Sequence, residues 1–315
     1  MSLDQFDLRL MRHGVEAVEG VAETLAATNV LRVLNGSGQI QSDNLEREID
    51  RPASGSRPYV PIRRRVVLTG ELELAGAATA GQAAPFGDFL RNAGHTEVLN
   101  TEPDNAEYTP AFTGFPSATA YFNHSGEVLH AVGGRARLTT LELAINAYAK
   151  AGFEFLGKVS PEPTEEAVPV DDQSAFQAPA PITEDVLTVS VGGVALEGVS
   201  LNVDFGVTQR LVYHSEGVFT RHTGRAATGT LRVYRPQIAE ADIRSMARNA
   251  TLQTILFDVV TGTAASDFSF ETPPAQLGEP QNVDIDGLRG WDIPVTFLPT
   301  AAANDDYTLR FGSRT

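Results

Sequence analysis

A strand pattern that occurs in both halves of the chain is the feature that most limits its fold. Residues 69–74 read TGELEL and residues 228–233 read TGTLRV, and in both an extended backbone places apolar residues on one side and polar residues on the other. Two further pairs of segments match in the same order: 30–36 with 186–192, and 153–156 with 295–298. The ordered matches predict one domain written twice, and two copies are too few for a solenoid.

The first strand of this pattern leads into a short amphipathic helix. A small, flexible Ala/Gly/Thr run follows it, and then Pro85 suits a first helical turn. Phe86, Phe89 and Leu90 share one face, and Gly94 can end the helix. A helical pattern also follows the second strand, with Ile238, Ala241, Met246 and Ala250 on or near one face.

The length and the matches predict two domains that consist mainly of β-structure. The chain has 315 residues, which is enough for two domains of ordinary size. We expect tandem β-sandwich or barrel-like domains at 1–158 and 182–315, each with a flanking short helix and a long loop. An N-terminal arm is expected at residues 1–28, with a helical turn over 15–26. Residues 159–181, rich in Pro and Glu, are expected to be an extended linker.

Two long polar segments precede the repeated strands. Residues 41–65 and 206–225 are each predicted to be a long loop, and loops of this length are often functional. A turn is expected at 35–38 and an irregular segment at 100–115. Strands are predicted at 30–34, 117–122, 128–132, 135–145, 152–156, 200–205, 254–260, 267–270 and 291–298, with hairpin turns at 125–126 and 192–193.

The bulk composition excludes several classes of protein. The chain has 24 basic and 40 acidic residues, a formal charge of −16, which argues against tight nucleic-acid binding. Simple solubility explains this charge, and so does a surface that lies near DNA without binding it. The chain has no Cys, so disulfides and thiolate metal sites are excluded. No apolar run is long enough to cross a bilayer, and the acidic N-terminus is unlike a secretory signal, so synthesis in the cytoplasm is expected.

No catalytic constellation stands out in the sequence. His124 and His130 flank a hairpin turn near Glu127, but two exposed histidines are the favoured interpretation over a metal site. Glu71 and Glu73 share a strand face that can line a glycosidase cleft, although a solvated outer face is favoured. The sequence therefore predicts a protein that is not an enzyme and needs no cofactor.

An arginine cluster in the first long loop is unusual in so acidic a chain. We expect this loop to pair with an acidic surface of a neighbouring copy, the alternative being a solvated basic loop. Tyr59 is a candidate anchor. The candidate interface residues of the two loops are Arg51, Arg57, Tyr59, Arg63, Arg64, Arg65, Arg210, Tyr213 and Arg221.

Several ordered segments of the first half resemble the tail tube proteins of tailed bacteriophages. The segment TAGQAAPFGDFLRNAG (79–94) is similar to the family's run from Thr-Ala-Gly into a Pro-Phe-Gly helix. The segments NLEREIDRPASGS (44–56) and SATAYFNHSGEVLHAVGGRA (117–136) are also similar, as are Tyr108-Thr109-Pro110 and Gly114-Phe115. The resemblance covers residues 15–157. The second half has no Pro-Phe-Gly and joins the family only through the internal repeat.

The resemblance implies a structural virion protein that polymerises. In this family six sandwich domains form a ring, the inner sheets join, the long loop packs on neighbouring subunits and rings, and genome DNA passes through the lumen without specific binding. With two domains per chain, three chains would close a pseudo-hexameric ring. Implied partners are other copies of the chain and tail proteins such as the tape measure, tail terminator and distal tail protein, with no membrane. The lumen candidates by strand phase are Glu71, Glu73, Glu142, Asn202 and Asp204.

Two alternatives stay open from the sequence. A ring of six chains would carry the second half as a decoration outside the tube. A tail-tip or receptor- or glycan-binding β-sandwich module is the alternative function. Among tail tubes, a long non-contractile tail is the expected setting.

Overall fold

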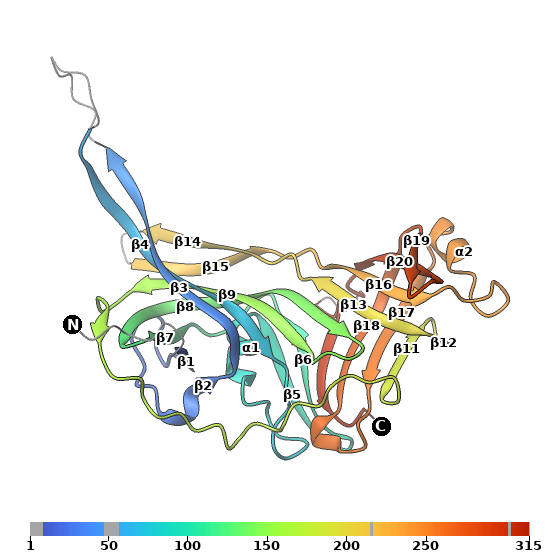
Figure 1. Cartoon of the computed structure of the whole chain (residues 1–315). Helices are drawn as coiled ribbons and strands as arrows, with labels where there is room; N and C mark the ends of the chain where they lie inside the picture. The colour runs from blue at the N-terminus through green and yellow to red at the C-terminus, as the bar shows by residue number, and fades with distance from the viewer. Residues whose placement is uncertain (1–8, 47–56, 215–216, 302–303, 315) are drawn as a thin grey trace.

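The chain folds into two β-sandwich halves that lie side by side (Figure 1). A computed structural model describes residues 9–46, 57–214, 217–301 and 304–314. The first half contains α1 (Gly87–Asn92) and strands β1 (Arg9–Val15), β2 (Val30–Leu31), β3 (Val33–Glu46), β4 (Tyr59–Glu73), β5 (His95–Thr101), β6 (Asp104–Pro110), β7 (Ala118–His124), β8 (Glu127–Ala144), β9 (Lys150–Val159) and β10 (Thr164–Glu165).

The second half likewise consists of one short helix and many strands, and its longest strands are shorter than those of the first half. It contains α2 (Ile243–Arg248) and strands β11 (Leu187–Val191), β12 (Val194–Leu196), β13 (Gly198–Asp204), β14 (Thr208–His214), β15 (Gly217–Gly224), β16 (Thr228–Tyr234), β17 (Leu252–Val259), β18 (Phe268–Leu277), β19 (Gln281–Ile285), β20 (Leu288–Phe297) and β21 (Thr308–Gly312). The predicted class, mainly β with a short helix in each half, is confirmed.

The two halves share one pattern of strand pairing. β4 lies between β3 and β9, as β16 lies between β13 and β20. β7 lies between β1 and β8, as β17 lies between β11 and β18. The β5–β6 hairpin is an insertion in the first half, between α1 and β7.

Two of the three sequence matches occupy equivalent positions in this pattern. Gly70 lies opposite Phe153, and Gly229 lies opposite Val295. The third match is wrong. Residues 30–36 form β2 and the start of β3, whereas residues 186–192 contain β11, whose equivalent by pairing is β1. Short alternating apolar runs are common in β proteins, so this match had no structural cause.

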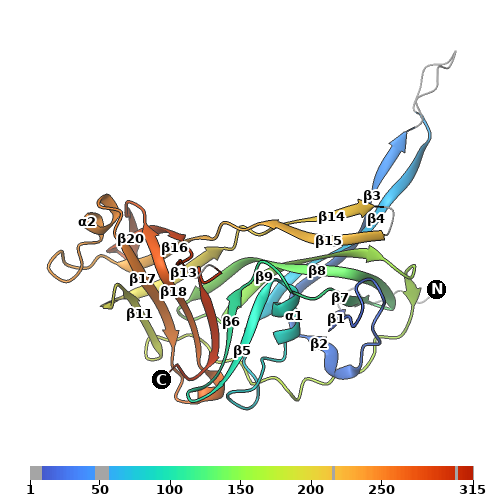
Figure 2. The ribbon, with the colours of Figure 1, turned by 180° about the vertical axis from the view of Figure 1, so that it is seen from behind.

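The halves are joined edge to edge in both layers of the sandwich. Residues 140–144 of β8 pair with residues 200–204 of β13, which gives a continuous sheet, here called the front sheet, with the order β3–β4–β9–β8–β13–β16–β20–β19. In the other layer β21 pairs with β6 of the inserted hairpin, as the view from behind makes clear (Figure 2). Each half therefore continues the sheets of the other.

The hydrophobic core is continuous across the two halves. Phe311 of β21 contacts Phe86 beside α1, with ring centroids 5.1 Å apart, and also Tyr108 and Phe268. These buried aromatic side chains gain both transfer free energy and edge-to-face contacts. In the part of the chain that the structure describes, no helix is long and apolar enough to span a membrane.

Within the described residues, both predicted loops contain a β-ribbon. Residues 41–46 of β3 pair with residues 59–65 of β4 in a ribbon that stands clear of the body, and β14 pairs with β15 in a ribbon that lies over the first half (Figure 1). Pairing within each ribbon satisfies its backbone N–H and C=O groups, so these strands form without the apolar alternation by which a strand is recognised in a sequence. Gly206 (φ +57°) makes the bend before β14, where a Cβ would lie 2.1 Å from the Ala226 carbonyl oxygen.

Three other sequence expectations need correction. The expected arm contains β1, and no helix occurs over residues 15–26. The expected turn at 35–38 is a bulge within the β3–β4 pairing, with Asn35 at φ 54°. The expected irregular segment at 100–115 contains the end of β5 and all of β6. In each case strand pairing satisfies backbone groups that the polar sequence seemed to leave to solvent.

The segment between the halves packs on the body instead of forming an extended tether. It contains β10, which pairs with β8, and Phe176, which is buried and bridges to Ala77. Ile182 is also buried and bridges to Ala147. The division into domains at 158 and 182 stays a prediction, because the sheets and the core cross that boundary.

Candidate assembly surfaces

The lumen candidates gather on the polar face of the front sheet. The Nζ atom of Lys150 lies 3.1 Å from carboxylate oxygens of both Glu71 and Glu142. Asn202 lies directly opposite Glu142 across the junction of the halves, and Asp204 is two residues farther along β13. The alternation of these strands therefore brings together side chains that are far apart in the sequence.

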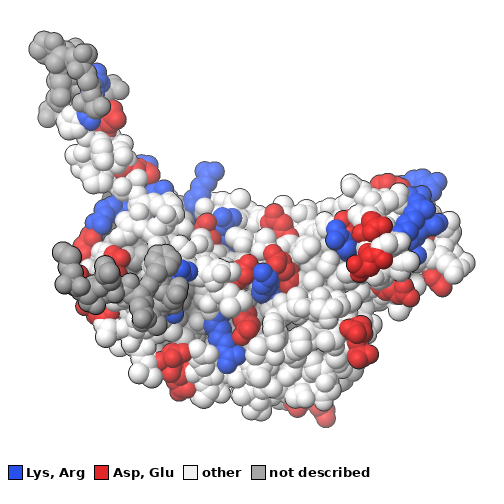
Figure 3. All heavy atoms as spheres, viewed as in Figure 1, with Lys and Arg blue, Asp and Glu red and all other residues white. Residues whose placement is uncertain are grey.

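Most carboxylates on this face are paired with a base. Glu73 lies 3.6 Å from Arg32, and Glu154 lies 3.2 Å from Arg137. Arg232 binds Asp292 through two hydrogen bonds of 2.7 and 2.8 Å. Hydrogen bonds that Lys150 donates to Glu142 and Glu71 raise the pKa of Lys150 above its ordinary value. The polar face is thus mixed in charge, and both signs are interspersed over the side of the molecule shown in Figure 3.

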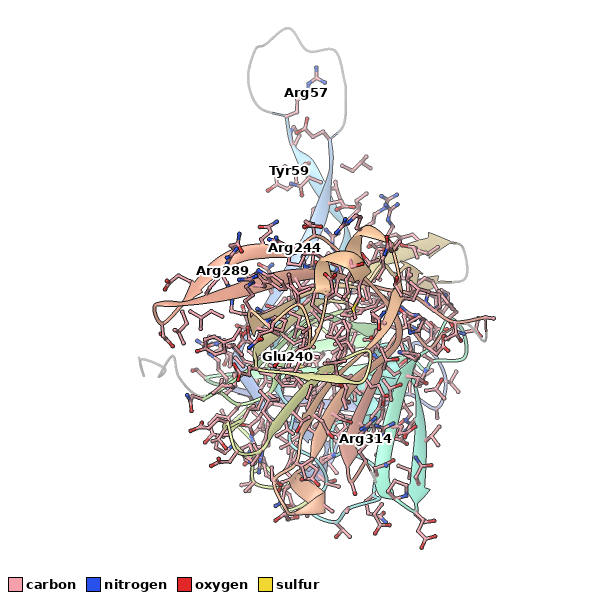
Figure 4. The ribbon with its side chains drawn as sticks, turned by 90° about the vertical axis from the view of Figure 1, so that its right-hand side faces the viewer. Arg57, Tyr59, Glu240, Arg244, Arg289 and Arg314 are labelled. Atoms are coloured by element: carbon pink, nitrogen blue, oxygen red, sulfur yellow. The ribbon has the colours of Figure 1, made fainter. Side chains whose placement is uncertain are left out.

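The β3–β4 ribbon carries exposed apolar side chains far from the core. Tyr59 and Val60 are 56% and 63% exposed, and Leu45 lies opposite Val60 on the partner strand. Arg57 and Tyr59 stand on the ribbon away from the body (Figure 4). Arg51, another candidate from the first predicted loop, lies outside the described residues. Exposed apolar residues grouped on a projection are typical of an interaction site.

The arginines at the base of this ribbon already have acidic partners within the chain. Arg64 forms a bidentate pair with Glu162. Arg65 lies 3.0 Å from Asp43, and Arg63 lies 3.7 Å from the same carboxylate. These ion pairs therefore fix the base of the ribbon. The candidate contacts to other copies are instead Tyr59 and Val60, which lie farther out on the ribbon.

The candidates of the second ribbon bind the first half of the same chain. The Tyr213 hydroxyl donates to the Arg63 carbonyl at 3.2 Å, and the Arg63 guanidinium lies over the Tyr213 ring. Arg221 binds both oxygens of Glu19, which follows β1. Arg210 is exposed and lies opposite Arg221 on the ribbon. This ribbon is thus an internal example of a projection from one half packed on another.

The junction under the second ribbon is held by residues that sequence reasoning missed. Glu19 also binds the buried Arg135, 2.8 Å away. Burial opposes the charge of Glu19, but hydrogen bonds from Arg221 and Arg135 outweigh it and lower the pKa of Glu19 below its ordinary value. The His222 Nε2 atom is 2.8 Å from the Ala136 carbonyl oxygen, and burial lowers the pKa of His222 to about 4. No spacing in the sequence relates these positions.

A second buried polar group joins the halves nearby. His95 contacts the Tyr307 hydroxyl through Nε2 at 2.9 Å and the Leu90 carbonyl through Nδ1 at 3.1 Å. Burial lowers the pKa of His95 to about 3, so the ring is neutral. Arg225 forms a bidentate pair with Asp306 at 2.7 and 2.9 Å. These contacts satisfy polar groups that would otherwise be costly to bury.

The histidines singled out by the sequence do not form a metal centre. His130 is buried, contrary to expectation, with its Nε2 atom 2.9 Å from the Thr164 hydroxyl. His124 lies at the end of β7 opposite Glu127. Within the described ranges, no group of three His, Cys, Asp or Glu side chains is arranged to hold a metal ion.

Both ends of the front sheet have an edge without a strand partner among the described residues. β3 pairs only with β4, and β19 pairs only with β20. Arg244 and Arg289 lie at the β19 end (Figure 4). An open strand edge is a row of unpaired backbone donors and acceptors that favours pairing with another chain.

Comparison with known proteins gives one family match. A family model described as phage tail tube protein matches residues 9–298, which include both halves of the chain. A search of curated proteins finds no match. The region matched extends beyond residues 15–157, where the sequence resemblance was found.

Proposed function

The chain belongs to the phage tail tube protein family, and on that premise we propose that three copies close a ring and that the rings stack into the tube. As a tail tube protein it is a structural component of the virion, located in the tail, in a family that is generally non-enzymatic. Membership also implies self-assembly and contact with other tail proteins.

The observation that carries the proposal is the pairing of β8 with β13. It joins two sandwich halves of the same topology edge to edge, in the way that neighbouring subunits of a ring would be joined. Each chain then supplies two adjacent positions of a pseudo-sixfold ring. A second half that merely decorated the tube would not need to continue the front sheet.

The free edges at the two ends of the front sheet supply the closing contact. β19 of one chain meets β3 of the next, and three such contacts leave no open edge. The three contacts within chains alternate with three between chains. The halves differ in charge one strand in from these contacts, as Glu71 and Glu73 of β4 correspond to Thr230 and Arg232 of β16.

The polar face of the front sheet is the proposed lumen wall. Glu71, Glu73, Glu142, Asn202 and Asp204 would line it, together with their paired bases. Among the described residues, the bases named on this wall are paired with carboxylates and form no free cluster to bind phosphates, so genome DNA can pass through it during ejection into the host. The exposed ribbon residues Tyr59 and Val60 would contact a neighbouring ring.

The ends of the tube are the proposed sites for the other partners. The tail terminator and the distal tail protein would cap stacked rings, and the tape measure would occupy the lumen before the DNA. A long non-contractile tail is the setting we favour.

Electron microscopy of the concentrated full-length protein, combined with a mass measurement of isolated rings, tests the proposal. Rings with a central hole and the mass of three chains are expected. Rings of six chains would overturn the trimer, and a monomer that stays discrete at all concentrations would overturn the tube.

A further inference from the structure

An open groove of about 760 Å³ lies beside the free edge of β3. It runs along the first residues of β3, where an added strand would pair, and residues of the segment between the halves line its other side. Among its lining residues are Met11, Leu31, Val33, Phe122, Val168 and Asp171. The groove is therefore positioned to receive the end of a hairpin whose strand pairs with β3.

The junction inside the chain shows what such a seated hairpin looks like. The turn that follows β8 rests on the start of the next half. The Ile145 amide donates to the Val199 carbonyl at 3.0 Å, and the Asn146 amide donates to the Ile182 carbonyl at 2.7 Å. The strand before this turn pairs with β13 through Glu142 and Asn202.

The repeated topology identifies the equivalent residues on β19. Phe153 and Val295 are equivalent by their pairing with the Thr-Gly strands. Lys150 lies three residues before Phe153 and Asp292 lies three residues before Val295, so Lys150 and Asp292 are equivalent too. Glu142 lies opposite Lys150, and Gln281 lies opposite Asp292. Gln281 is therefore the equivalent of Glu142.

The same argument identifies the equivalent residues on β3. Glu71 and Thr230 are the third residues of the two Thr-Gly patterns. Leu34 lies opposite Glu71, and Asn202 lies opposite Thr230. Leu34 is therefore the equivalent of Asn202, and Leu31 is the equivalent of Val199.

We propose that the β19–β20 hairpin of one chain seats its tip in this groove of the next chain, with Gln281 opposite Leu34 in an antiparallel pair. This inference rests on the proposed ring and adds its register and its socket. The partner is a second copy of this chain. The β19–β20 hairpin is the equivalent of the β8–β9 hairpin, which occupies the matching position at the junction inside the chain.

The tip is long enough to enter the groove and carries an exposed apolar side chain that the groove can cover. The β19–β20 hairpin runs from Gln281 to Asp292, whereas the equivalent stretch in the first half runs only from Glu142 to Lys150. The longer hairpin can reach into a groove. Leu288 at its tip is 61% exposed, and the groove supplies apolar side chains for it.

A disulfide between copies tests the register, and the absence of native Cys makes any bond unambiguous. The double variant Leu34→Cys/Gln281→Cys changes two exposed residues, so it should fold as the wild type does. After assembly and mild oxidation, covalent dimers and trimers are expected on a non-reducing gel. Rings that remain fully monomeric on the gel would overturn the register while leaving the ring itself intact.

Two matched controls make this result specific. Glu142→Cys/Asn202→Cys is the equivalent pair within one chain, so it should close an internal bond with no gain in mass. Gln39→Cys/Gln281→Cys moves one partner along β3 and should not cross-link. A covalent trimer from the shifted pair would show that β19 binds in another register. Failure of the wild type to form rings would instead overturn the proposed function.

The groove is tested separately at the hairpin tip. Added to the Leu34→Cys/Gln281→Cys variant, Leu288→Asp should reduce the yield of covalent trimer at least tenfold at limiting protein concentration. Leu252→Asp, at a position of the second half that is 52% exposed, should leave the yield unchanged. Equal yields from the two variants would show that the tip does not occupy the groove.

Discussion

At the scale of single residues, Glu19 is the side chain on which the junction of the halves most depends. It binds Arg135 of β8 and Arg221 of β15, and Arg135 is buried. Glu19→Gln leaves a buried guanidinium without a counter-charge, so the free energy of unfolding at pH 7 should fall by about 2–4 kcal/mol. Denaturant titration measures this, with the exposed Glu23→Gln as control. Equal stability of the two variants would contradict the prediction.

The pH dependence of Glu19 has a definite sign. Its pKa is lower in the folded chain than its ordinary value of 4.5. The stabilisation is therefore fully present above that value and is lost as the pH falls below it through the folded pKa. Glu19→Gln removes this contribution, so the variant and the wild type should become more similar in stability in acid.

The buried histidines make a separate prediction about acid. Burial lowers the pKa of His95 to about 3 and that of His13 to about 4, from an ordinary value of 6.5. Only the unfolded chain takes up these protons between about pH 6.5 and 4. Each of the two imidazoles therefore lowers the free energy of unfolding by about 1.4 kcal/mol for every unit by which the pH falls in this range. His95→Gln should reduce the slope of unfolding free energy against pH by about that amount. His124→Gln, at a partly exposed position, is the control, and equal slopes for the two variants would contradict the assignment.

At the scale of elements, the sequence predicts the helix and the strands whose residue spacing reflects their own buried face. α1 lies within its predicted bounds because Phe86, Phe89 and Leu90 share a face that the core buries. The Thr-Gly strands alternate because one face is buried and the other is polar. Both features can be found from spacing alone.

The elements that were missed have causes outside their own sequence. β5, β6 and the ribbons are polar, and their strands are defined by partners that supply backbone hydrogen bonds. β8 and β13 are both half-buried strands, and the residue pattern of neither strand indicates that it pairs with the other. The intrachain partners of the arginine cluster, Asp43 and Glu162, are not adjacent to it in sequence, so the sequence alone does not reveal these ion pairs.

The β3–β4 ribbon makes a prediction at this scale. Tyr59→Asp/Val60→Asp replaces exposed residues that stand clear of the body, so the free energy of unfolding should change by less than about 0.5 kcal/mol. If the ribbon contacts a neighbouring ring, the variant should form rings but few stacked tubes, because two desolvated charges are placed in the contact. Electron microscopy counts tubes and rings. Val212→Asp on the second ribbon, 42% exposed, is the control, and long tubes from the Tyr59/Val60 variant would remove this ribbon from the stacking contact.

At the scale of the whole molecule, continuity between the halves predicts that they fold as one unit. The front sheet, the opposite layer and the core all cross the boundary. Half of the contacts that a ring of six domains needs would then be fixed on folding, and only the contacts between chains depend on concentration. Assembly by this route loses less entropy of association than assembly from six separate domains.

The polar face of the front sheet makes the last prediction, which concerns the bore of the assembled tube. Asn202→Lys/Asp204→Lys places two cations at exposed positions on the proposed lumen wall and changes the charge by +3 per chain, since the charge change is +1 for Asn and +2 for Asp. Thr101→Lys/Glu102→Lys makes the same change at the tip of the β5–β6 hairpin, away from this face. Both variants should bind short double-stranded DNA at about 50 mM salt and release most of it by about 200 mM. Only DNA bound by the first should be protected from nuclease, because it lies inside the tube. Equal digestion of DNA on the two kinds of tube would show that the polar face does not line the lumen.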